Sequence, residues 1–366
     1  MSYTDRAGGL VTSAHMVRRR LPPFFSNLLP EGHLRSYLAE KAGVNPEREF
    51  FLMAALGADV AGAVTVRPLD EGPGEATDET GVDHGNGGVD RPDVLRFSLA
   101  AVQLKFSAII KSAGGLTIPA HGVGGSWIVK LPSARFDAVP ENEFAMLALA
   151  RAVGITVPEN RLVSVAAIHG LPPDAARRDA MALAVERFDR APGGQRIHME
   201  DFAQVFGAFP EAKYKGRSYA NIASVLWAEA GEQDTYDFVR RLVFSVLIGN
   251  PDMHLKNWSV VYPDGRTPVL APAYDFVATL PYIPGDSLAL SFGGSRSLDG
   301  ITWDQVRRFV DTARLPMKPV REAVRETAER TAEAWRKLDQ KDVLPQAMRT
   351  IIDGQLARAV RGALEA

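Results

Sequence analysis

The sequence contains no cysteine, carries almost no net charge and has no long hydrophobic run. The absence of cysteine excludes disulfides, thiolate nucleophiles and cysteine-based zinc sites, and it fits a reducing compartment. The formal net charge of -2 gives no electrostatic reason to expect direct binding to nucleic acid or to an anionic membrane. No apolar segment reaches the roughly 18 to 20 residues that cross a bilayer, and the N-terminus lacks a signal-peptide core. We therefore expect a soluble, cytoplasmic protein that does not act at a membrane.

The length and composition indicate a chain of more than one folded unit. With 366 residues, 46% of them hydrophobic and 23% charged, the chain has the composition of a globular protein. A chain of this size buries roughly three-quarters of its unfolded surface, which is enough for two lobes with their own cores. We expect an α+β protein with four segments: a small folded unit at 1–69, a flexible linker at 70–93, a β-rich lobe at 94–190 and a mostly helical lobe at 191–366.

The hydrophobic pattern supports this division. Residues 60–68 alternate like a strand, whereas residues 70–93 are rich in Gly, Asp, Glu and Thr and have too little apolar surface to offset the entropy of ordering. Strand patterns follow at 95–110 and in SWIVKLP, and again in RLVSVAAIHG and MALAVERFDR. A helix is expected at 141–154, ending at Gly154.

The second half of the chain is expected to be mainly helical. Residues 235–249 form a buried helix that Gly249 ends, and the tail from about Lys318 to Ala366 contains two helices separated near VLPQ. Between these helices lies the stretch GNPDMHLKNWSVVYPDGRTPVLAPAYDF, which contains several side chains able to bind a metal or a proton. This stretch is the best candidate for a functional site.

A hairpin is expected to bring the polar side chains of this stretch together. Asn250-Pro251 cannot continue the helix, so residues 252–257 fall on a loop. The β-prone runs 258–262 and 267–271 are joined by Pro-Asp-Gly, a turn sequence, and should pair antiparallel. The two ends of this hairpin carry Asn257 and Asp275, whose oxygens would then converge on one point. Hard oxygen ligands of this kind, completed by phosphate and water, suit Mg²⁺.

The spacing of these residues is that of a protein kinase. Asp252 precedes Asn257 by five positions, as the catalytic base of a kinase precedes its metal-binding Asn, and Asp275-Phe276 stands where the metal-binding Asp-Phe pair is expected. Lys256 could neutralise charge on the transferred phosphoryl group. No Arg precedes Asp252 and no Gly follows Phe276, so the motif differs from that of ordinary eukaryotic-type kinases.

Further upstream, the order of residues again follows a kinase. Lys130 lies in a strand-like run after a Gly-rich stretch, and a helix with Glu143 follows. This order matches the strand lysine that binds the α- and β-phosphates of ATP and the helix glutamate that orients it. The segment around Glu186 and Phe188 is expected to cross between the lobes, where backbone groups could bind adenine while Phe188 packs on its ring.

The chain resembles the HipA family of bacterial serine/threonine kinases, the toxins of HipA/HipB toxin-antitoxin pairs, over about residues 22–350. The segments that carry the resemblance occur in the family's order: SLAAVQLKFSA, WIVKLP, LAVERFDR, EDFAQVFG, GNPDMHLKNWSV and PAYDF. The resemblance implies a bilobal, protein-kinase-like fold that uses ATP and Mg²⁺, with Asp252 as the base and with Asn257 and Asp275 as the metal ligands. The implied ATP site consists of Ala100, Ala101, Val102, Gln103, Leu104, Lys105, Lys130, Glu186, Arg187, Phe188, His254, Leu255, Lys256, Asn257, Tyr274 and Asp275.

The resemblance also implies regulation and partners. Ser98 matches the serine that such kinases autophosphorylate, which expels the neighbouring loop from the nucleotide site, although Ala101 stands where the family usually has Gly. The family's typical substrate is an aminoacyl-tRNA synthetase, and its partner is a HipB-like helix-turn-helix antitoxin through which it meets DNA indirectly. FFSNLLPEGHLR resembles the family's N-terminal region. The chain begins some tens of residues short of a full-length member, so this subdomain is expected either to be trimmed or to be supplied by a separate small protein.

Two alternatives to a protein kinase remain open from the sequence. Antibiotic kinases share a similar catalytic loop, so the chain could be a small-molecule phosphotransferase. It could also be a non-catalytic module that acts only by joining an antitoxin on DNA. Binding of ATP and Mg²⁺ would separate the enzymes from the module, because a ligand that binds only the native state stabilises it.

Overall fold

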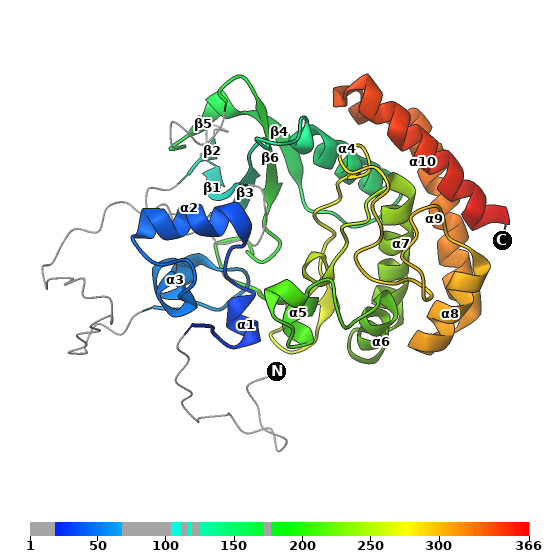
Figure 1. The fold of residues 1–366 in the computed structure, drawn as a ribbon, viewed down its shortest axis with the longest axis horizontal. Helices are drawn as coiled ribbons and strands as arrows, with labels where there is room; N and C mark the ends of the chain where they lie inside the picture. The colour runs from blue at the N-terminus through cyan, green and yellow to red at the C-terminus, as the bar shows by residue number, and fades with distance from the viewer. Residues whose placement is uncertain (1–18, 68–103, 111–115, 119–124, 172–176, 366) are drawn as a thin grey trace, which may run out of the picture.

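The computed structural model describes residues 19–67, 104–110, 116–118, 125–171 and 177–365. The expected linker at 70–93, the proposed phosphorylation site Ser98 and the loop residues Ala100 to Gln103 lie outside these ranges. Figure 1 shows the N-terminal helices beneath a twisted sheet on one side and a bundle of helices on the other. This arrangement matches the expected β-rich lobe followed by a mostly helical one.

Three short helices form the N-terminal part of the described chain: α1 (Pro23–Ser26), α2 (Gly32–Ala42) and α3 (Glu49–Leu56), which a single 3-10 turn (Gly57–Asp59) extends. The prediction of a strand at 60–68 is wrong for the residues that the structure describes, because Val60 to Arg67 form no strand. Gly62 has a φ of 76° there, and a Cβ on it would lie 3.0 Å from the backbone nitrogen of Met199. The close approach of these two backbones bends the segment and prevents an extended strand.

A six-stranded sheet forms the first lobe, with the order β4-β6-β3-β1-β2-β5. All neighbours are antiparallel except β2 and β5. In the pairing of β1 with β3, Lys105 stands opposite Lys130, so two lysines meet at one end of the sheet. The strands are β1 (Lys105–Ile110), β2 (Leu116–Thr117), β3 (Trp127–Lys130), β4 (Asn160–Ser164), β5 (Ile168–His169) and β6 (Met181–Glu186).

Helix α4 (Val139–Ala152) connects β3 to β4 and joins the sheet to the second lobe. Its Ala and Leu residues favour a helix, and its apolar face, including Met146 and Leu149, is fully buried. The chain leaves the helix at Gly154, which has a φ of 90° and follows the cap residue Val153. The expected helix and its glycine stop are confirmed.

The second lobe is built around α7 (Glu232–Ile248), which packs against α6, α9 and α10. The side chains of Phe238 and Phe244 on α7 are completely buried. The predicted division of the C-terminal tail into two helices is confirmed by α9 and α10. The other helices of this lobe are α5 (Phe202–Val205), α6 (Tyr219–Glu229), α8 (Trp303–Ala313), α9 (Met317–Lys337) and α10 (Gln346–Glu365).

The expected hairpin is present as β8 (Ser259–Tyr262) and β9 (Val269–Leu270), which pair antiparallel with Val260 opposite Leu270. Its turn is stabilised by Asp264, whose carboxylate accepts hydrogen bonds from the backbone N–H groups of Arg266 and Thr267 at 2.8 and 2.7 Å. The hairpin is not isolated, because β7 (His198–Asp201) pairs with β8 on its other edge. The sequence did not predict β7, whose four residues alternate too briefly to show a strand period.

Two hydrophobic cores lie within the described residues. One core joins the N-terminal helices to the sheet through residues such as Leu34, Leu52, Phe106 and Val129. The other fills the helical lobe and includes α4. The N-terminal helices are therefore packed against the sheet as part of the first lobe.

Candidate functional site

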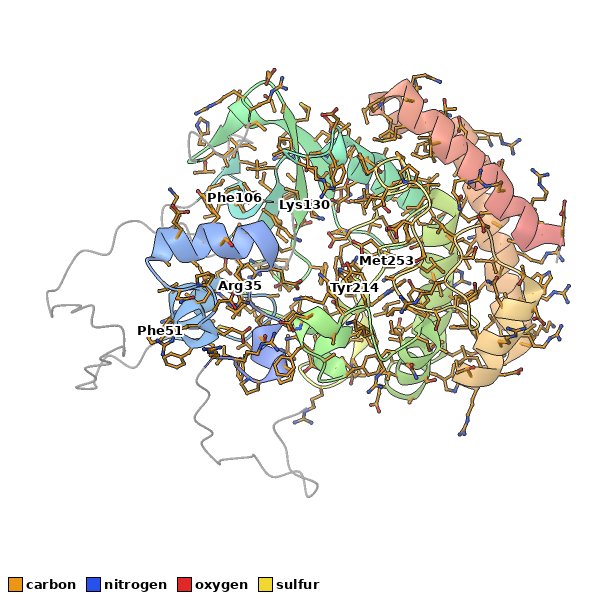
Figure 2. The ribbon with its side chains drawn as sticks, in the orientation of Figure 1. Arg35, Phe51, Phe106, Lys130, Tyr214 and Met253 are labelled. Atoms are coloured by element: carbon orange, nitrogen blue, oxygen red, sulfur yellow. The ribbon has the colours of Figure 1, made fainter. Side chains whose placement is uncertain are left out.

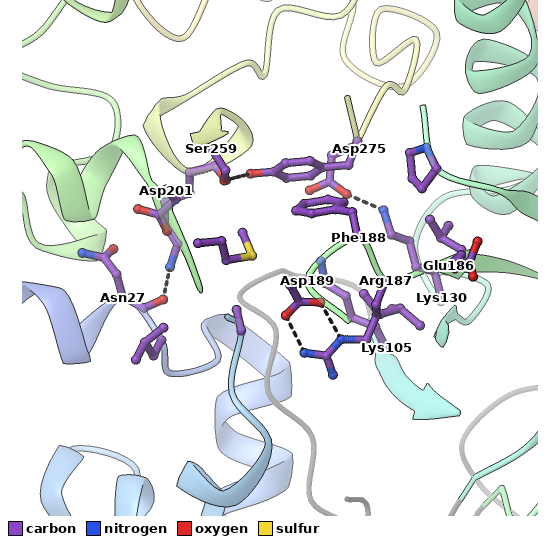
Figure 3. A pocket seen from close by; sticks show the side chains of 18 of the residues that line it. Asn27, Lys105, Lys130, Glu186, Arg187, Phe188, Asp189, Asp201, Ser259 and Asp275 are labelled. Carbon is purple, nitrogen blue, oxygen red and sulfur yellow. Dashed lines mark hydrogen bonds and ion pairs between the residues drawn. The ribbon is translucent and has the colours of Figure 1, made fainter. Parts of the chain in front are cut away.

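A pocket lies between the sheet, the N-terminal helices and the β7-β8-β9 sheet (Figure 3). It brings together side chains that are up to 248 positions apart in the chain, from Asn27 to Asp275. Eight of the residues expected at the ATP site line it: Lys105, Lys130, Glu186, Arg187, Phe188, Lys256, Tyr274 and Asp275. Of the other expected residues that the structure describes, Leu104, His254, Leu255 and Asn257 are not part of this lining, although Asn257 lines a smaller neighbouring pocket.

Lys130 is the centre of a buried ion-pair cluster. Its Nζ lies 2.5 Å from Oε1 of Glu143 on α4 and also binds the carboxylate of Asp275, as Figure 3 shows for the second pair. Burial would lower the pKa of Lys130, but the charges of Asp275 and Glu143 raise it above its usual range. Lys130 is therefore held as an ammonium group at the edge of the pocket.

Lys105 adds a second buried amine to this cluster, beside Lys130 on the neighbouring strand. Burial lowers the pKa of Lys105, and the nearby ammonium of Lys130 acts in the same direction. Burial would raise the pKa of Asp275, but Lys130 and Lys105 keep that pKa well below its usual range. Asp275 is therefore a carboxylate, the form in which it can bind a cation.

The backbone at Asp275 is strained. Its φ of 55° lies in the left-handed region, which residues other than glycine rarely adopt. The conformation is held on both sides, because the Asn250 amide donates to the carbonyl of Asp275 at 3.3 Å and the buried ring of Phe276 packs 5.0 Å from that of Phe244. Strain of this kind persists where the surrounding structure fixes it, often at functional sites.

The loop after α7 carries Asp252 in a fixed position. Gly249 ends the helix with a φ of 72°, and the buried side chains of Met253 and Leu255 anchor the loop. The Asn257 amide nitrogen donates to the carbonyl of Asp252 at 2.7 Å, which leaves the amide oxygen of Asn257 as the atom available to a cation. Burial raises the pKa of Asp252 above its ordinary value, while the Tyr214 hydroxyl opposes this shift.

Tyr214 contacts two residues of the loop. Its hydroxyl donates to Oδ1 of Asp252 at 2.9 Å, and its ring meets that of His254 edge-on at 5.1 Å. Burial lowers the pKa of His254 to about 3, so its ring is neutral near pH 7. Figure 2 shows Tyr214 and Met253 on the side of the helical lobe and Lys130 on the side of the sheet. No sequence pattern pointed to Tyr214, which lies 38 positions before Asp252 in an irregular segment.

Lys256 points away from solvent toward the N-terminal helices. Its amine lies 2.8 Å from Oε1 of Glu31 and donates to the carbonyl of Asn27 at 2.9 Å. Lys256, Asn27 and Leu28 all line the pocket. The N-terminal helices thus form part of the pocket wall, which the sequence did not predict.

The segment after β6 forms the opposite wall. The rings of Phe188 and Tyr274 face each other with centroids 5.7 Å apart, and both line the pocket. The N–H of Glu186 donates to the carbonyl of Glu159 at 2.7 Å. This N–H is therefore already engaged, so an adenine contact in this segment would use other backbone groups. The other backbone groups of the segment still border the pocket.

A buried ion network ties this segment to the N-terminal helices. Arg187 binds Asp189 in a bidentate manner at 2.9 and 2.8 Å, and Arg190 binds Oδ1 of Asp59 at 2.8 Å. The Arg187 guanidinium also lies 3.3 Å from Asp59. The side chain of Arg187 is therefore engaged with carboxylates of the protein, so its contribution to a ligand site is structural.

The oxygens that could hold a divalent ion come from two residues. Asn257 offers its amide oxygen and Asp275 its carboxylate, and both are the hard ligands that Mg²⁺ prefers. Among the residues that the structure describes, no group of three His, Cys, Asp or Glu side chains could hold a metal. The donor set thus fits an ion that takes few ligands from protein and the rest from phosphate and water, as Mg²⁺ does in kinases.

A second cavity is bordered by Tyr214. Helix α2, the segment before it and the segment 210–214 line this cavity, which includes Glu31, Arg35 and Lys213. Its charges are mostly paired within the wall, as in the contacts of Lys213 with Glu31 and of Arg35 with Glu49. Tyr214 thus borders this cavity and also bonds to Asp252, which itself lines neither cavity.

The described helices include none that is both long and apolar enough to span a bilayer.

Comparison with known proteins gives the context for the pocket. A family model described as the HipA-like C-terminal domain matches residues 97–335, and one described as the HipA N-terminal domain matches residues 9–67.

Named relatives cover most of the chain. “Putative kinase Y4dM” of Sinorhizobium fredii is 51% identical over 338 residues, which cover 92% of this chain and 81% of that protein. “Serine/threonine-protein kinase toxin HipA” of Shewanella oneidensis is 27% identical over 329 residues, which cover 80% of this chain and 71% of that protein.

A solved structure of the Shewanella oneidensis MR-1 complex of HipA, HipB and operator DNA contains a chain that superposes on this one with a TM-score of 0.70 and 25% sequence identity. The match covers 94% of this chain and 87% of the Shewanella chain. The fold is therefore the HipA-like, kinase-related α+β fold that the sequence predicted. Because the C-terminal family model spans residues 97–335 and thus contains every residue of the lysine, glutamate and aspartate cluster, the chain belongs to the HipA family.

Proposed function

We propose that this protein is an ATP- and Mg²⁺-dependent serine/threonine protein kinase. One observation carries the proposal: a strand lysine, Lys130, binds both a helix glutamate, Glu143, and the aspartate after the hairpin, Asp275. Protein kinases use this set of residues to hold the phosphates of ATP and the metal. The kinase names of the relatives from Sinorhizobium and Shewanella agree with it.

ATP would bind in the pocket between the lobes. The amines of Lys105 and Lys130 supply positive charge at one end, and the rings of Phe188 and Tyr274 supply an aromatic surface for adenine at the other. The proposed site also includes Lys256 and, outside the described residues, Ala100 to Gln103.

Asn257 and Asp275 would hold Mg²⁺. Held there, the ion would supply positive charge against the phosphates during transfer. The protein prepares this site by keeping Asp275 ionised and by fixing the amide of Asn257 against the carbonyl of Asp252.

Asp252 would accept the proton of the acceptor hydroxyl. Tyr214 orients its carboxylate from one side through its hydroxyl. The chemistry then depends on positioning and electrostatics, without a covalent intermediate on the enzyme.

The finer biological role is proposed from the properties of the family. The acceptor would be a translation factor such as an aminoacyl-tRNA synthetase in the cytoplasm, and the partner a HipB-like antitoxin, as the Shewanella complex with HipB and operator DNA suggests. Ser98 would be the autophosphorylation site. Mass spectrometry after incubation with ATP and Mg²⁺ tests this, and an unmodified Ser98 in active protein would contradict it.

The kinase itself is tested by two substitutions, Asp252→Asn and Asp275→Asn. Loss of a general base lowers a rate by roughly 10² to 10⁴-fold, and loss of a metal ligand should have an effect of similar size. The readout is radioactive phosphate transferred from ATP to the protein itself. Asp311→Asn is the matched control, because Asp311 is exposed on α8 away from the pocket. Wild-type rates in either pocket variant would refute the assignment.

A further inference from the structure

The carboxylate of Glu31 lies between two lysines that come from separate segments of the second lobe. Its Oε1 is 2.8 Å from Nζ of Lys256, and its Oε2 is 2.8 Å from Nζ of Lys213. Glu31 is the residue immediately before α2, but its side chain does not cap that helix. The carboxylate is directed instead at the two lysines, which lie 182 and 225 positions further along the chain.

The three side chains are largely removed from solvent. The side chain of Lys256 is 5% exposed, that of Lys213 is 15% exposed and that of Glu31 is 20% exposed. Burial would raise the pKa of Glu31, but Lys256 and Lys213 outweigh it and lower that pKa to about 2. Glu31 is therefore ionised near pH 7, and the two contacts are ion pairs that solvent screens weakly.

Each lysine is connected to a different part of the proposed site. Lys256 lines the nucleotide pocket, and among the described residues Glu31 is the only carboxylate within ion-pairing distance of it. Lys213 precedes Tyr214, whose hydroxyl binds Asp252, and the carbonyl of Lys213 accepts a hydrogen bond from the N–H of Leu255 at 3.2 Å. Glu31 thus contacts one residue on the phosphate side and one on the side of the base.

We propose that Glu31 is a positioning residue of the phosphoryl-transfer site, through which the N-terminal helices fix Lys256 in the wall of the nucleotide pocket and hold Lys213 and Tyr214 against the loop of Asp252. This inference rests on the proposed kinase function. Under this proposal the N-terminal helices belong to the site, since they supply the carboxylate that orients both lysines.

The two contacts predict two separable kinetic effects. Without Glu31, Lys256 loses its ion-pair partner and is no longer fixed in the wall of the nucleotide pocket, so the KM for ATP rises. Lys213 is also released, which loosens Tyr214 and Asp252 and lowers the maximal rate. Coupling between contacting groups of this kind corresponds to about a tenfold change in each quantity.

The test compares Glu31→Gln, Glu31→Asp and Glu47→Gln. Gln keeps the shape of the side chain but removes its charge, whereas Asp keeps the charge on a shorter arm that reaches one lysine at a time. Glu47→Gln removes the same charge from the wall of the same second cavity, where Glu47 is exposed and forms no ion pair with the residues that the structure describes. Initial rates of self-phosphorylation at varied ATP concentration give the maximal rate and the KM.

The expected result is a raised KM and a lowered maximal rate in Glu31→Gln, partial recovery of one of them in Glu31→Asp, and values within twofold of the wild type in Glu47→Gln. If Glu31→Gln matches Glu47→Gln in both quantities, the proposal is wrong. It is equally wrong if Glu31→Asp is as impaired as Glu31→Gln in both, because charge would then not be the cause.

A measurement without nucleotide separates this proposal from the kinase assignment. Hydrogen exchange of the free protein should become faster in Glu31→Gln at residues 211–216 and 252–258, where Leu255 N–H bonds to Lys213, and stay unchanged in α9. Faster exchange confined to these segments supports the positioning role of Glu31 even if the wild type transfers no phosphate. Unchanged exchange there, or an equal increase throughout the protein, would overturn it.

Discussion

At the scale of single residues, the site depends on charges that hold one another in place. Lys130 is held by Glu143 and Asp275, and Asp252 is held by Tyr214 and by the amide of Asn257. Buried polar groups of this kind are fixed only when each has a partner, and a missing partner leaves the other group mobile or shifts its charge. The residues around Asp252 therefore have a measurable role even where they contact no nucleotide.

Tyr214→Phe tests this role. The substitution removes the hydroxyl that orients Asp252 and keeps the ring against His254, so the maximal rate of phosphate transfer should fall by about tenfold, the loss of roughly 1.4 kcal/mol of transition-state stabilisation. The KM for ATP should stay within twofold, because Tyr214 does not line the nucleotide pocket.

Tyr236→Phe is the matched control, since Tyr236 also donates to a carboxylate, that of Glu232 at 2.9 Å, but lies near the start of α7, at the end of the helix opposite to the loop of Asp252. A comparable loss of rate in both variants, or a loss in neither, would contradict the role of Tyr214.

At the scale of elements, the loop of Asp252 is placed by the helix before it and the hairpin after it. Helix α7 ends at Gly249, and the first residue of the loop, Asn250, bonds to the backbone of Asp275 beyond β9. The hairpin closes the distance between the two ends, and β7 supports it on the outer edge. The geometry of the site therefore depends on one helix end and one turn.

Gly249→Ala should disturb this arrangement. The φ of 72° is costly for alanine, and a Cβ would lie 3.1 Å from Cβ of Leu280 and 3.3 Å from Cγ of Gln355. We expect the free energy of unfolding to fall by about 1 to 2 kcal/mol, and phosphate transfer to fall as the loop shifts. Chemical denaturation and the self-phosphorylation assay measure the two effects.

Gly354→Ala is a control that should change the free energy of unfolding in the opposite direction. Gly354 lies inside α10 with only the end of Arg358 nearby, so alanine should raise the free energy of unfolding by about 0.5 to 1 kcal/mol. Equal effects of the two substitutions on stability would show that the end of α7 does not depend on the left-handed glycine.

At the scale of the whole molecule, the N-terminal helices are joined to the rest in three ways. They share a core with the sheet, they supply Glu31 and Asn27 to the loop of Asp252, and they supply Asp59 to the arginines next to the pocket. Asp59 is 2% exposed and contacts Arg187, Arg190 and Arg196. Removing its charge leaves buried guanidinium groups with too few acceptors.

Asp59→Ala should therefore lower the free energy of unfolding by about 3 to 5 kcal/mol, the cost of breaking a buried ion pair from one side. Asp339→Ala, at an exposed residue without an ion pair among the described residues, should change it by less than about 0.5 kcal/mol. Urea denaturation followed by circular dichroism measures both. A change below 1 kcal/mol in Asp59→Ala would mean that the network contributes little to stability.

Local patterns in the sequence predicted much of this protein. The apolar spacing of α7, the glycines after α4 and α7, and the Pro-Asp-Gly turn act through neighbouring residues, so each could be recognised without the fold. The spacing of Asp252, Asn257 and Asp275 could be recognised for the same reason, because a loop and a hairpin connect them.

The tertiary structure alone decided which distant residues complete the site. Glu31, Asn27 and Tyr214 have no sequence pattern that links them to Lys256 or Asp252, and Asp59 has none that links it to Arg187. These contacts arise because the N-terminal helices and the sheet bury a common core, which places the helix ends against the second lobe. Hydrophobic burial is not directional, so sequence periodicity predicts which face of an element is buried, and only packing determines which charges then meet.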